Sequence, residues 1–241
     1  MARASRLLLH LAARREGSTA AAAAGALGLT VPTTHHLLNT LAEEGLVVKE
    51  ADRRYVLGPR VAVLADGFVE QAVPEYLGAP LRELAEATGE TAYLAAWGRG
   101  EIRVMASVEG ARAVRVAGTE PGRYRHAHAR ATGKLLLAFA RPEARAAYLA
   151  AHPPERVTEA TICEPAALEA ELAAIRERGY SEDREEFAEG VSCVSAPLLA
   201  EDRVLVAAFT LSAPSERYER HRDQLRDAVL AAARSSLRRS T

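Results

Sequence analysis

Apolar side chains recur at helical spacing near the start of the chain. Leu7, Leu8 and Leu11 share one face of residues 5–14, which predicts an amphipathic helix. The alanine-rich residues 20–24 predict a second helix, which Ser18 or Thr19 can cap and Gly25 or Gly28 can end.

A third helix is predicted to begin at Thr30, which can cap it, and to end at Gly45. Its inward-facing positions are Thr34, Leu37, Leu38 and Leu41. Apolar residues 46–48 and 55–57 flank a charged turn, so they predict a β-hairpin. Three helices followed by a hairpin are typical of a winged helix-turn-helix domain.

In such a domain, the third helix lies in the major groove of DNA and presents short polar side chains to the base edges. Asn39 can pair with adenine, and Thr33 and His36 can reach phosphates or bases. Arg53 and Arg54 in the turn can meet the adjacent DNA backbone. The predicted DNA-contacting residues are Thr33, Thr34, His35, His36, Asn39, Thr40, Arg53 and Arg54. The alternative is a small helical domain whose polar face is solvated or binds another protein.

The rest of the chain mixes helices and strands without strict alternation. Residues 61–73 predict a helix with one apolar face, which can link two domains, provide a dimerisation surface, or do both. Further helices are predicted at residues 77–88, from Thr132 onward, at 165–178 and from about residue 218. Strands are predicted at residues 91–97, 101–108, about 113–117, 193–199 and 205–212. This mixture predicts an α+β fold around a central antiparallel sheet.

Charge is distributed unevenly along the chain. The 241 residues carry a formal charge of −1, which by itself gives no reason to expect a nucleic-acid partner. Residues 1–60, however, hold eight Lys and Arg against five Asp and Glu, a charge of +3, and the remainder holds −4. This asymmetry indicates a basic module that meets a polyanion, joined to an acidic module with another task.

Two cysteines make no disulfide framework, and the apolar run at residues 7–9 is too short for a signal peptide. No uncharged apolar stretch approaches the roughly 20 residues that span a bilayer. We therefore expect a cytoplasmic protein.

Several stretches resemble the isocitrate lyase regulator (IclR) family of bacterial transcription factors. Residues 28–38 (GLTVPTTHHLL) and 41–47 (LAEEGLV) resemble its DNA-binding domain. One departure is His36, because the family commonly has arginine before the Leu-Leu pair. The C-terminal domain of the family is similar to three further stretches, residues 128–138 (HARATGKLLLA), 178–186 (RGYSEDREE) and 190–197 (GVSCVSAP).

The resemblance covers nearly the whole chain and implies its organisation. It implies a winged helix-turn-helix DNA-binding domain at residues 1–58, a linker helix at 59–73, and a GAF-like α/β effector-binding domain at 74–241. It also implies a transcriptional repressor that is a homodimer or a dimer of dimers and binds an inverted-repeat operator. The implied effector is a small organic or aromatic carboxylic acid.

The residues themselves suggest how such a pocket binds an acid. Backbone N–H groups at the start of the helix that contains Gly133 lack intrahelical partners and can bind an anion, and Thr132 adds a hydroxyl. Thr210 and Ser212 alternate along one strand, so both can point into one cavity. Carried over from the family, the pocket lining comprises Val114, Ala131, Thr132, Asp183, Val191, Cys193, Thr210 and Ser212. The alternatives are a simple helix cap at Thr132 and a polar strand face at Thr210.

Two other kinds of site are open. An enzyme would use Cys193 as nucleophile, His128 as base and Asp183 to orient the base, but no oxyanion motif accompanies them. His126 and His128 have a spacing that can hold a metal on a strand, but no carboxylate or cysteine lies close to them in the sequence. We therefore expect no catalytic residue, no metal and no cofactor.

Overall fold

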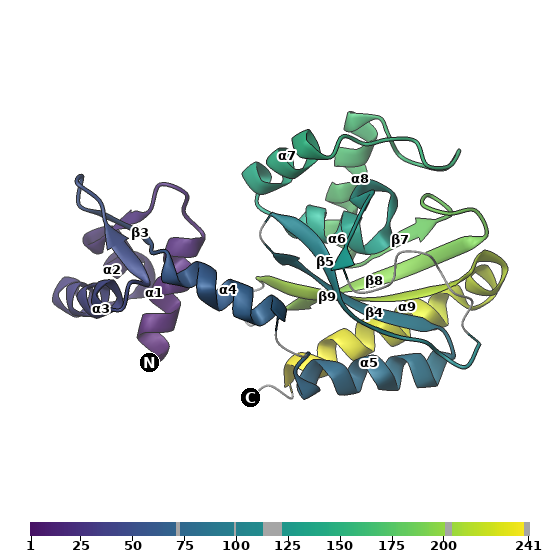
Figure 1. The fold of residues 1–241 in the computed structure, drawn as a ribbon, viewed down its shortest axis with the longest axis horizontal. Helices are drawn as coiled ribbons and strands as arrows, with labels where there is room; N and C mark the ends of the chain where they lie inside the picture. Colours follow the sequence, from purple (N-terminus) through teal and green to yellow (C-terminus); the bar gives the residue numbers. More distant parts are fainter. Residues whose placement is uncertain (71–72, 99, 113–121, 201–203, 239–241) are drawn as a thin grey trace. The chain divides into compact units, whose positions relative to one another are not determined.

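The computed structural model describes residues 1–70, 73–98, 100–112, 122–200 and 204–238. The chain divides into two compact units, residues 1–70 and 71–241 (Figure 1). The predicted strand at residues 113–117, and with it Val114, lies outside the described residues.

The first unit is the winged helix-turn-helix domain that the sequence predicts. Its helices are α1 (Ala2–Ala12), α2 (Ala20–Leu27), α3 (Val31–Glu43) and α4 (Arg60–Glu70). Its strands are β1 (Ser18–Thr19), β2 (Val47–Lys49) and β3 (Arg54–Leu57), which pair antiparallel in the order β1-β3-β2. The two-residue strand β1 is too short to give a hydrophobic pattern, and the sequence did not predict it.

Local capping decides where the helices of this unit begin and end. The Thr19 hydroxyl accepts a hydrogen bond of 3.2 Å from the N–H of Ala22, and Gly28 ends α2 with a φ of 65°. The Thr30 hydroxyl accepts a hydrogen bond of 3.3 Å from the N–H of Thr33 and so caps α3. Capping by threonine and termination of α2 by glycine are therefore confirmed, with Gly28 rather than Gly25 as the terminator.

The second unit is the α+β domain. Its helices are α5 (Glu75–Thr88), the 3-10 helix η1 (Ala127–Ala129), α6 (Ala131–Phe139), α7 (Pro142–Ala151), α8 (Pro165–Arg178) and α9 (Ser215–Arg238). Its strands are β4 (Thr91–Gly98), β5 (Glu101–Val108), β6 (Gly122–Arg123), β7 (Ser181–Arg184), β8 (Val191–Leu199) and β9 (Leu205–Pro214). These described strands form one antiparallel sheet in the order β6-β5-β4-β9-β8-β7, which confirms the predicted central sheet.

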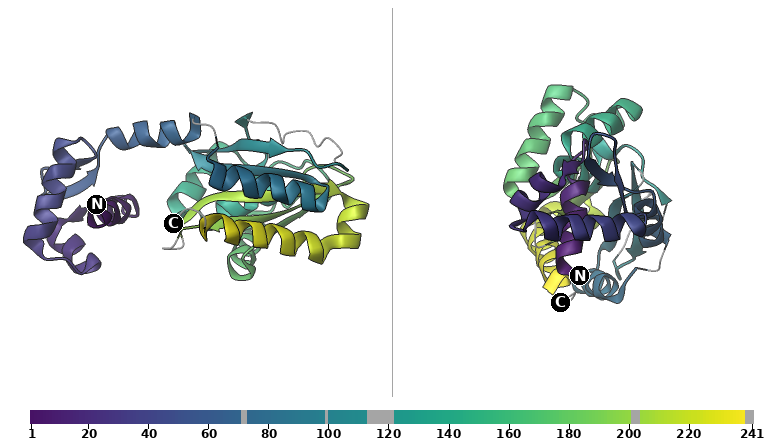
Figure 2. Two further views of the ribbon diagram at one scale, coloured as in Figure 1. Left: turned by 90° about the horizontal axis from the view of Figure 1, so that it is seen from below. Right: turned by 90° about the vertical axis from the view of Figure 1, so that its left-hand side faces the viewer.

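Helices cover both faces of this sheet. α5 and α9 lie side by side on one face, and α6, α7 and α8 lie on the other (Figures 1 and 2). The α5/α9 face is closed by an apolar core that includes Leu84, Leu94, Phe209 and Val229. On the opposite face the core is formed by side chains such as Leu136, Leu172 and Ile175. Burial of apolar surface, which contributes roughly 25 cal/mol per Å², stabilises the sheet from both faces.

Most predicted elements of this unit are confirmed. The helix at residues 165–178 has the predicted bounds, and the C-terminal helix begins at Ser215, three residues before the predicted start. The sequence did not predict η1, α7, β6 or β7. The sequence of β7, Ser-Glu-Asp-Arg, contains no apolar residue and therefore does not predict a strand. Pairing with β8 stabilises it as one. Within the described residues, no helix is long and apolar enough to cross a membrane.

Candidate functional site

The outer face of α3 is polar and exposed. His35, His36, Asn39 and Thr40 are all exposed, which is the placement that base or phosphate contact requires. The ring of His35 lies 6.4 Å from that of Tyr55, so His35 borders strand β3 of the wing. The Thr40 hydroxyl donates to the carbonyl of His36 at 3.1 Å.

Two threonines at the start of α3 form hydrogen bonds with the residue that caps the helix. Thr34 is fully buried and its hydroxyl donates to the carbonyl of Thr30 at 3.0 Å. Its side chain cannot reach DNA from this position, so its inclusion among the DNA-contacting residues was wrong, whereas its assignment to the inward face is confirmed. Thr33 is half-buried, and its hydroxyl lies 2.8 Å from that of Thr30.

The wing presents two arginines at its turn. Arg53 is exposed with a φ of 67°, a left-handed conformation that places it at the tip of the β2–β3 turn. Arg54 is half-buried, and its Nε lies 3.3 Å from a carboxylate oxygen of Asp52. The guanidinium of Arg54 therefore has an acidic neighbour that competes with a phosphate.

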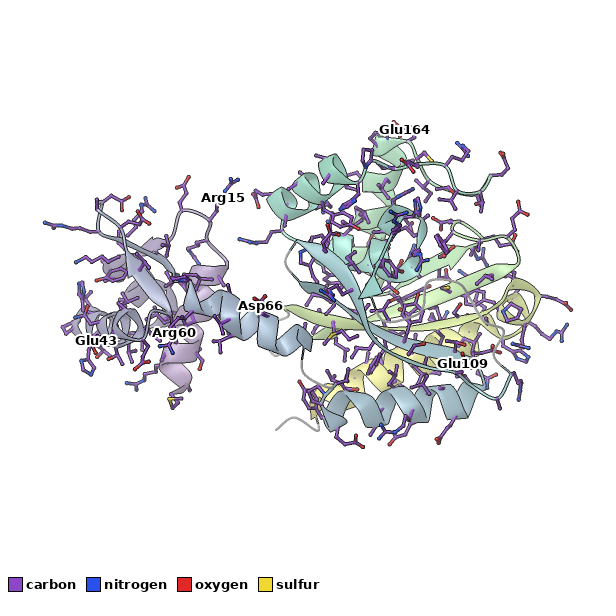
Figure 3. The ribbon with its side chains drawn as sticks, in the orientation of Figure 1. Arg15, Glu43, Arg60, Asp66, Glu109 and Glu164 are labelled. Carbon is purple, nitrogen blue, oxygen red and sulfur yellow. The ribbon has the colours of Figure 1, made fainter. Side chains whose placement is uncertain are left out.

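Figure 3 shows that Arg15 projects from the loop between α1 and β1, and that Glu43 and Arg60 stand at the end of α3 and the start of α4. Arg60 donates to the carbonyl of Glu44 at 3.0 Å, so it satisfies a carbonyl at the C-terminus of α3. This contact joins α4 to the helix that is predicted to read DNA.

A layer of small polar side chains covers part of the sheet face under α6. Strand pairing places two rows of residues directly opposite one another across β7, β8, β9 and β4. One row is Asp183, Cys193, Ser212 and Thr91, and the other is Ser181, Ser195, Thr210 and Tyr93. Every member of both rows is buried. The structure thus brings Asp183, Cys193, Thr210 and Ser212 together, as the resemblance implied.

Hydrogen bonds join this layer, which we call the polar layer, to the first turn of α6. The hydroxyls of Thr132 and Thr210 lie 2.5 Å apart, and Thr210 donates to the Ser195 hydroxyl at 2.9 Å. The Thr132 hydroxyl also donates to the Tyr93 hydroxyl at 3.1 Å. Tyr93 and Ser195 were missed at the sequence level, although Ser195 follows Cys193 at the same two-residue alternation that selected Thr210 and Ser212.

Cys193 is a buried thiol and not an activated one. Its Sγ donates to the Ser212 hydroxyl at 3.3 Å, and burial raises its pKa to about 12. The nearby Asp183 acts in the same direction. Because a thiolate is the nucleophilic form of cysteine, this environment argues against the catalytic role considered for Cys193.

Asp183 is held by the turn that follows β7. Its Oδ1 accepts hydrogen bonds from the N–H groups of Glu186, at 2.8 Å, and Phe187, at 3.4 Å. Burial raises the pKa of Asp183 to about 7, and the Glu186 carboxylate adds to the effect. At neutral pH a substantial fraction of this carboxyl group therefore carries a proton.

Lys134 is a structural residue. It is 1% exposed, its Nζ pairs with the Glu186 carboxylate, and it lies 3.7 Å from a carboxylate oxygen of Glu171. Breaking such a buried pair by removing one partner costs about 3–5 kcal/mol, so Lys134 fixes α6 against the β7–β8 turn and α8.

The first turn of α6 lies close to the preceding 3-10 helix. Ala131 is buried, and a Cβ at Gly133 would lie 2.2 Å from the carbonyl oxygen of Ala127, so only glycine fits there. The N–H groups of this turn precede the first intrahelical bond, from Lys134 to the Arg130 carbonyl. Val191 is half-buried at the first position of β8, two residues from Cys193.

Arg130 is a buried cation beside this turn that the sequence-level site did not include. It is 6% exposed, and its guanidinium lies over the rings of Tyr124 at 4.5 Å and Phe187 at 3.5 Å. It stands inside the family-like stretch at residues 128–138, but no pattern in the sequence distinguishes it from a surface arginine.

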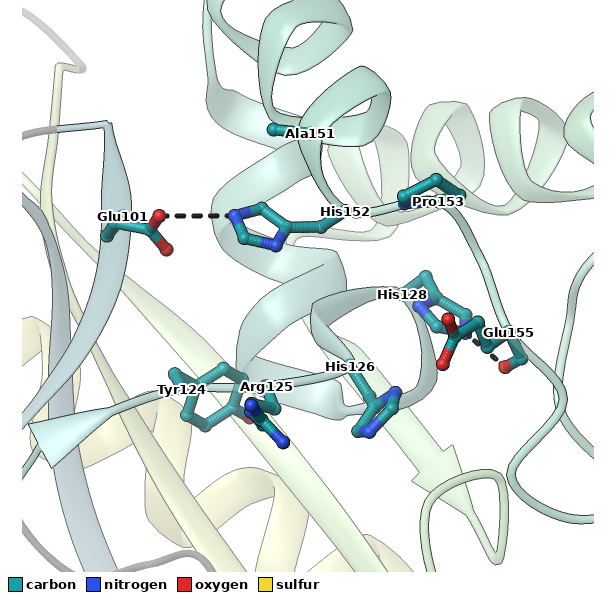
Figure 4. Close-up of a pocket in the computed structure, with 9 residues that line it drawn as sticks. All are labelled: Glu101, Tyr124, Arg125, His126, His128, Ala151, His152, Pro153 and Glu155. Carbon is teal, nitrogen blue, oxygen red and sulfur yellow. Dashed lines mark hydrogen bonds and ion pairs between the residues drawn. The ribbon is translucent and has the colours of Figure 1, made fainter.

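A cavity of about 320 Å³ borders Tyr124, and Figure 4 shows the residues that line it. Its lining residues are Glu101, Tyr124, Arg125, His126, His128, Ala151, His152, Pro153 and Glu155. His152 Nε2 lies 3.1 Å from Glu101, and His128 Nε2 donates to the carbonyl of Glu155 at 2.8 Å. Within the described residues, no three His, Cys, Asp or Glu side chains form a group that could hold a metal ion.

Family models match both units of the chain. Residues 1–51 match the IclR helix-turn-helix domain, and residues 69–237 match the bacterial transcriptional regulator IclR C-terminal domain.

Named relatives are regulators of the same kind. The HTH-type transcriptional regulator BhcR of Paracoccus denitrificans is 34% identical over 235 residues, which cover 94% of this chain and 82% of BhcR. The transcriptional repressor IclR of Escherichia coli is 31% identical over 215 residues, which cover 87% of this chain and 78% of the repressor.

Solved structures share the fold over the whole chain. An IclR-type transcriptional regulator from Silicibacter sp. TM1040 is 28% identical with a TM-score of 0.63, and the match covers 99% of this chain and 94% of that one. An IclR homologue from Microbacterium hydrocarbonoxydans, solved in complex with 4-hydroxybenzoate, is 23% identical with a TM-score of 0.60, and the match covers 98% of each chain.

Proposed function

We propose that this chain, which belongs to the IclR family of bacterial transcriptional regulators, is a repressor whose operator binding is controlled by a small organic acid. In this proposal residues 1–58 bind DNA, residues 59–73 link the domains, and residues 74–241 bind the acid. The protein acts in the cytoplasm as a homodimer or a dimer of dimers on an inverted-repeat operator, without enzymatic activity and without a cofactor.

The exposed polar face of α3 supports the DNA-binding half of the proposal. Asn39 stands at the middle of this face, where an amide can make a bidentate contact with adenine. His36 is exposed at the position where the family commonly has arginine, so an imidazole replaces a guanidinium at this phosphate contact. Arg53 and Arg54 add backbone contacts that position the domain without reading sequence.

The polar layer is the observation that supports the effector-binding part of the proposal. Buried hydroxyls cost free energy unless they are hydrogen-bonded, and here they hydrogen-bond within the layer and with Thr132 in the first turn of a helix, where an anion can also bind. The set comprises Thr132, Thr210, Ser195 and Ser212. In the Microbacterium hydrocarbonoxydans homologue a domain of this fold accompanies a bound hydroxybenzoate, which is consistent with an acid ligand.

The Asn39→Ala variant tests base reading. It should lose discrimination between operator and scrambled DNA by about 1–3 kcal/mol while non-specific binding persists, because the amide contacts a base edge and the arginines contact phosphates. Fluorescence anisotropy with both DNA duplexes measures this. Equal losses on the two duplexes would refute base reading by Asn39.

The Thr210→Val variant tests the effector site. Valine keeps the shape of threonine but removes the hydroxyl that contacts Thr132 and Ser195. We expect acid affinity to fall about tenfold, the loss that one hydrogen bond of roughly 1.4 kcal/mol implies, while operator affinity without acid is unchanged. Calorimetry and anisotropy measure the two quantities. An undiminished response to acid would show that the acid binds elsewhere.

A further inference from the structure

We propose that Val31, the first residue of α3, contacts the 5-methyl group of a thymine in each half-site of the operator and so determines the base at that position. This inference rests on the proposed function and extends it, because it adds an apolar base contact to the polar contacts of α3.

Val31 stands on the face of α3 that is proposed to meet DNA. Residues four positions apart lie on the same face of a helix, and Val31, His35 and Asn39 follow one another at this interval. All three are exposed, and Val31 is 42% exposed. Its side chain therefore lies in the same row as the amide that is proposed to pair with adenine.

Val31 takes no part in the core of the first unit. That core contains Leu38 and Leu41 of α3, and Leu37 packs against it. Among the residues of α3, all of which the structure describes, Val31 is the one large apolar side chain that is exposed. Valine also has a lower helix propensity than alanine. Neither core packing nor helix formation therefore accounts for a valine at this position.

A thymine methyl group is a suitable partner for this side chain. In the major groove the methyl group distinguishes thymine from the other bases, and small apolar side chains contact it. In helix-turn-helix proteins the N-terminal residues of the recognition helix contact the base edges, and Val31 directly follows Thr30, which caps α3. Branching at Cβ restricts the valine side chain largely to one rotamer in a helix, so its methyl groups have a fixed direction.

Helix geometry limits the distance between this contact and the contact of Asn39. Val31 and Asn39 are eight positions apart, so they are separated by about 12 Å along α3. Since successive base pairs are about 3.4 Å apart, the thymine and the adenine should lie within about four base pairs of each other in one half-site.

Removing the methyl group from the DNA tests the contact directly. The operator is first obtained by selection from random duplex DNA with the full-length chain. Each of its thymines is then replaced in turn by deoxyuridine, which lacks only the 5-methyl group. We expect one thymine in each half-site at which this replacement lowers the affinity about fourfold, because burial of one methyl group contributes about 0.8 kcal/mol. Fluorescence anisotropy measures the dissociation constants.

Variants of the chain assign this loss to one side chain. Val31→Ser should no longer distinguish thymine from deoxyuridine at that position, whereas Val31→Ile should retain the preference. The melting temperature of Val31→Ser should not fall, because Val31 lies outside the core and serine and valine have similar helix propensities. The matched control is Val157→Ser, which removes a valine of similar exposure, 37%, from the second unit and should bind both duplexes as the native chain does.

The outcomes separate this assignment from the proposed function. If the native chain prefers its operator to scrambled DNA, but deoxyuridine at no thymine lowers its affinity, the assignment is overturned and the proposed function stands. The same holds if Val31→Ser keeps the preference for thymine. If the folded full-length chain enriches no sequence, the reading of DNA by α3 is refuted, and the role of Val31 with it.

Discussion

Buried ionisable residues in and beside the polar layer influence one another. Lys134 pairs with the Glu186 carboxylate, whereas burial and the same Glu186 raise the pKa of Asp183 and so favour its neutral form. Neighbouring groups of both signs surround Asp183, with Lys134 on α6, Glu186 on the β7–β8 turn and Cys193 on β8. The balance of these interactions makes the stability of the second unit depend on pH.

The pH dependence that Asp183 contributes has a definite sign. Its pKa is about 7 in the folded chain, against 3.8 for an unperturbed Asp, so between these values the folded state binds the additional proton. The free energy of unfolding therefore falls as the pH rises from about 4 to about 7, at up to roughly 1.4 kcal/mol per pH unit, and is constant above this range.

Asp183→Asn isolates this contribution. The amide oxygen can still accept from the N–H groups of Glu186 and Phe187, but it does not ionise. Relative to the native chain, the variant should gain stability between pH 4 and pH 8 in urea unfolding experiments. The exposed Glu143→Gln variant is the control. A stability difference that is the same at both pH values would contradict the raised pKa.

At the scale of elements, α3 and the wing form one polar surface, on which Asp52 competes with DNA phosphates for Arg54. Asp52 accepts from the N–H of Arg54 at 3.0 Å and lies 3.3 Å from its guanidinium. Since exposed ion pairs contribute little to stability, this contact has more effect on DNA binding than on folding.

Asp52→Asn should therefore strengthen non-specific DNA binding. Asparagine keeps the oxygen that accepts from Arg54 N–H but removes the negative charge, so we expect affinity to rise several-fold at low salt, with an unchanged melting temperature. Anisotropy with a scrambled duplex measures this, and Glu143→Gln in α7 serves as the matched loss of one exposed acid. Equal affinities of the Asp52→Asn variant and the native chain would show that Arg54 does not contact the backbone.

Elements with strong local signals were predictable from the sequence, and those that depend on tertiary pairing were not. The Thr30 hydroxyl caps the start of α3, and Gly28 in a left-handed conformation ends α2, so local residue chemistry predicts these helix ends. β7 becomes a strand only because β8 pairs with it, and its polar composition hides this. The polar layer was partly predictable from strand alternation, but the packing of Arg130 over the ring of Tyr124 depends on the tertiary fold.

For the whole molecule, the near-zero net charge conceals a basic first unit and an acidic remainder. Residues 1–60 carry +3 and the rest −4, so the second unit should reduce non-specific attraction to DNA while the first makes the contacts. DNA affinity should fall steeply between low and physiological salt, because phosphate contacts release counterions.

The exposed apolar side chains of α4 predict self-association. Val63 and Leu64 are 67% and 62% exposed, which is unusual for adjacent large apolar residues on a helix. Leu64→Glu should shift the native chain from dimer or tetramer toward monomer in analytical ultracentrifugation, without lowering the melting temperature of the monomer. A native chain that is monomeric at micromolar concentration would contradict this assignment.

The central claim is that the first unit reads a symmetric DNA sequence, and selection from random duplex DNA tests it most directly. The full-length chain should enrich an inverted repeat whose half-sites are about one helical turn apart, or a multiple of it, and Asn39→Ala should abolish the enrichment. Recovery of no common sequence by the folded native chain, or the same sequence by native and Asn39→Ala proteins, would contradict the account.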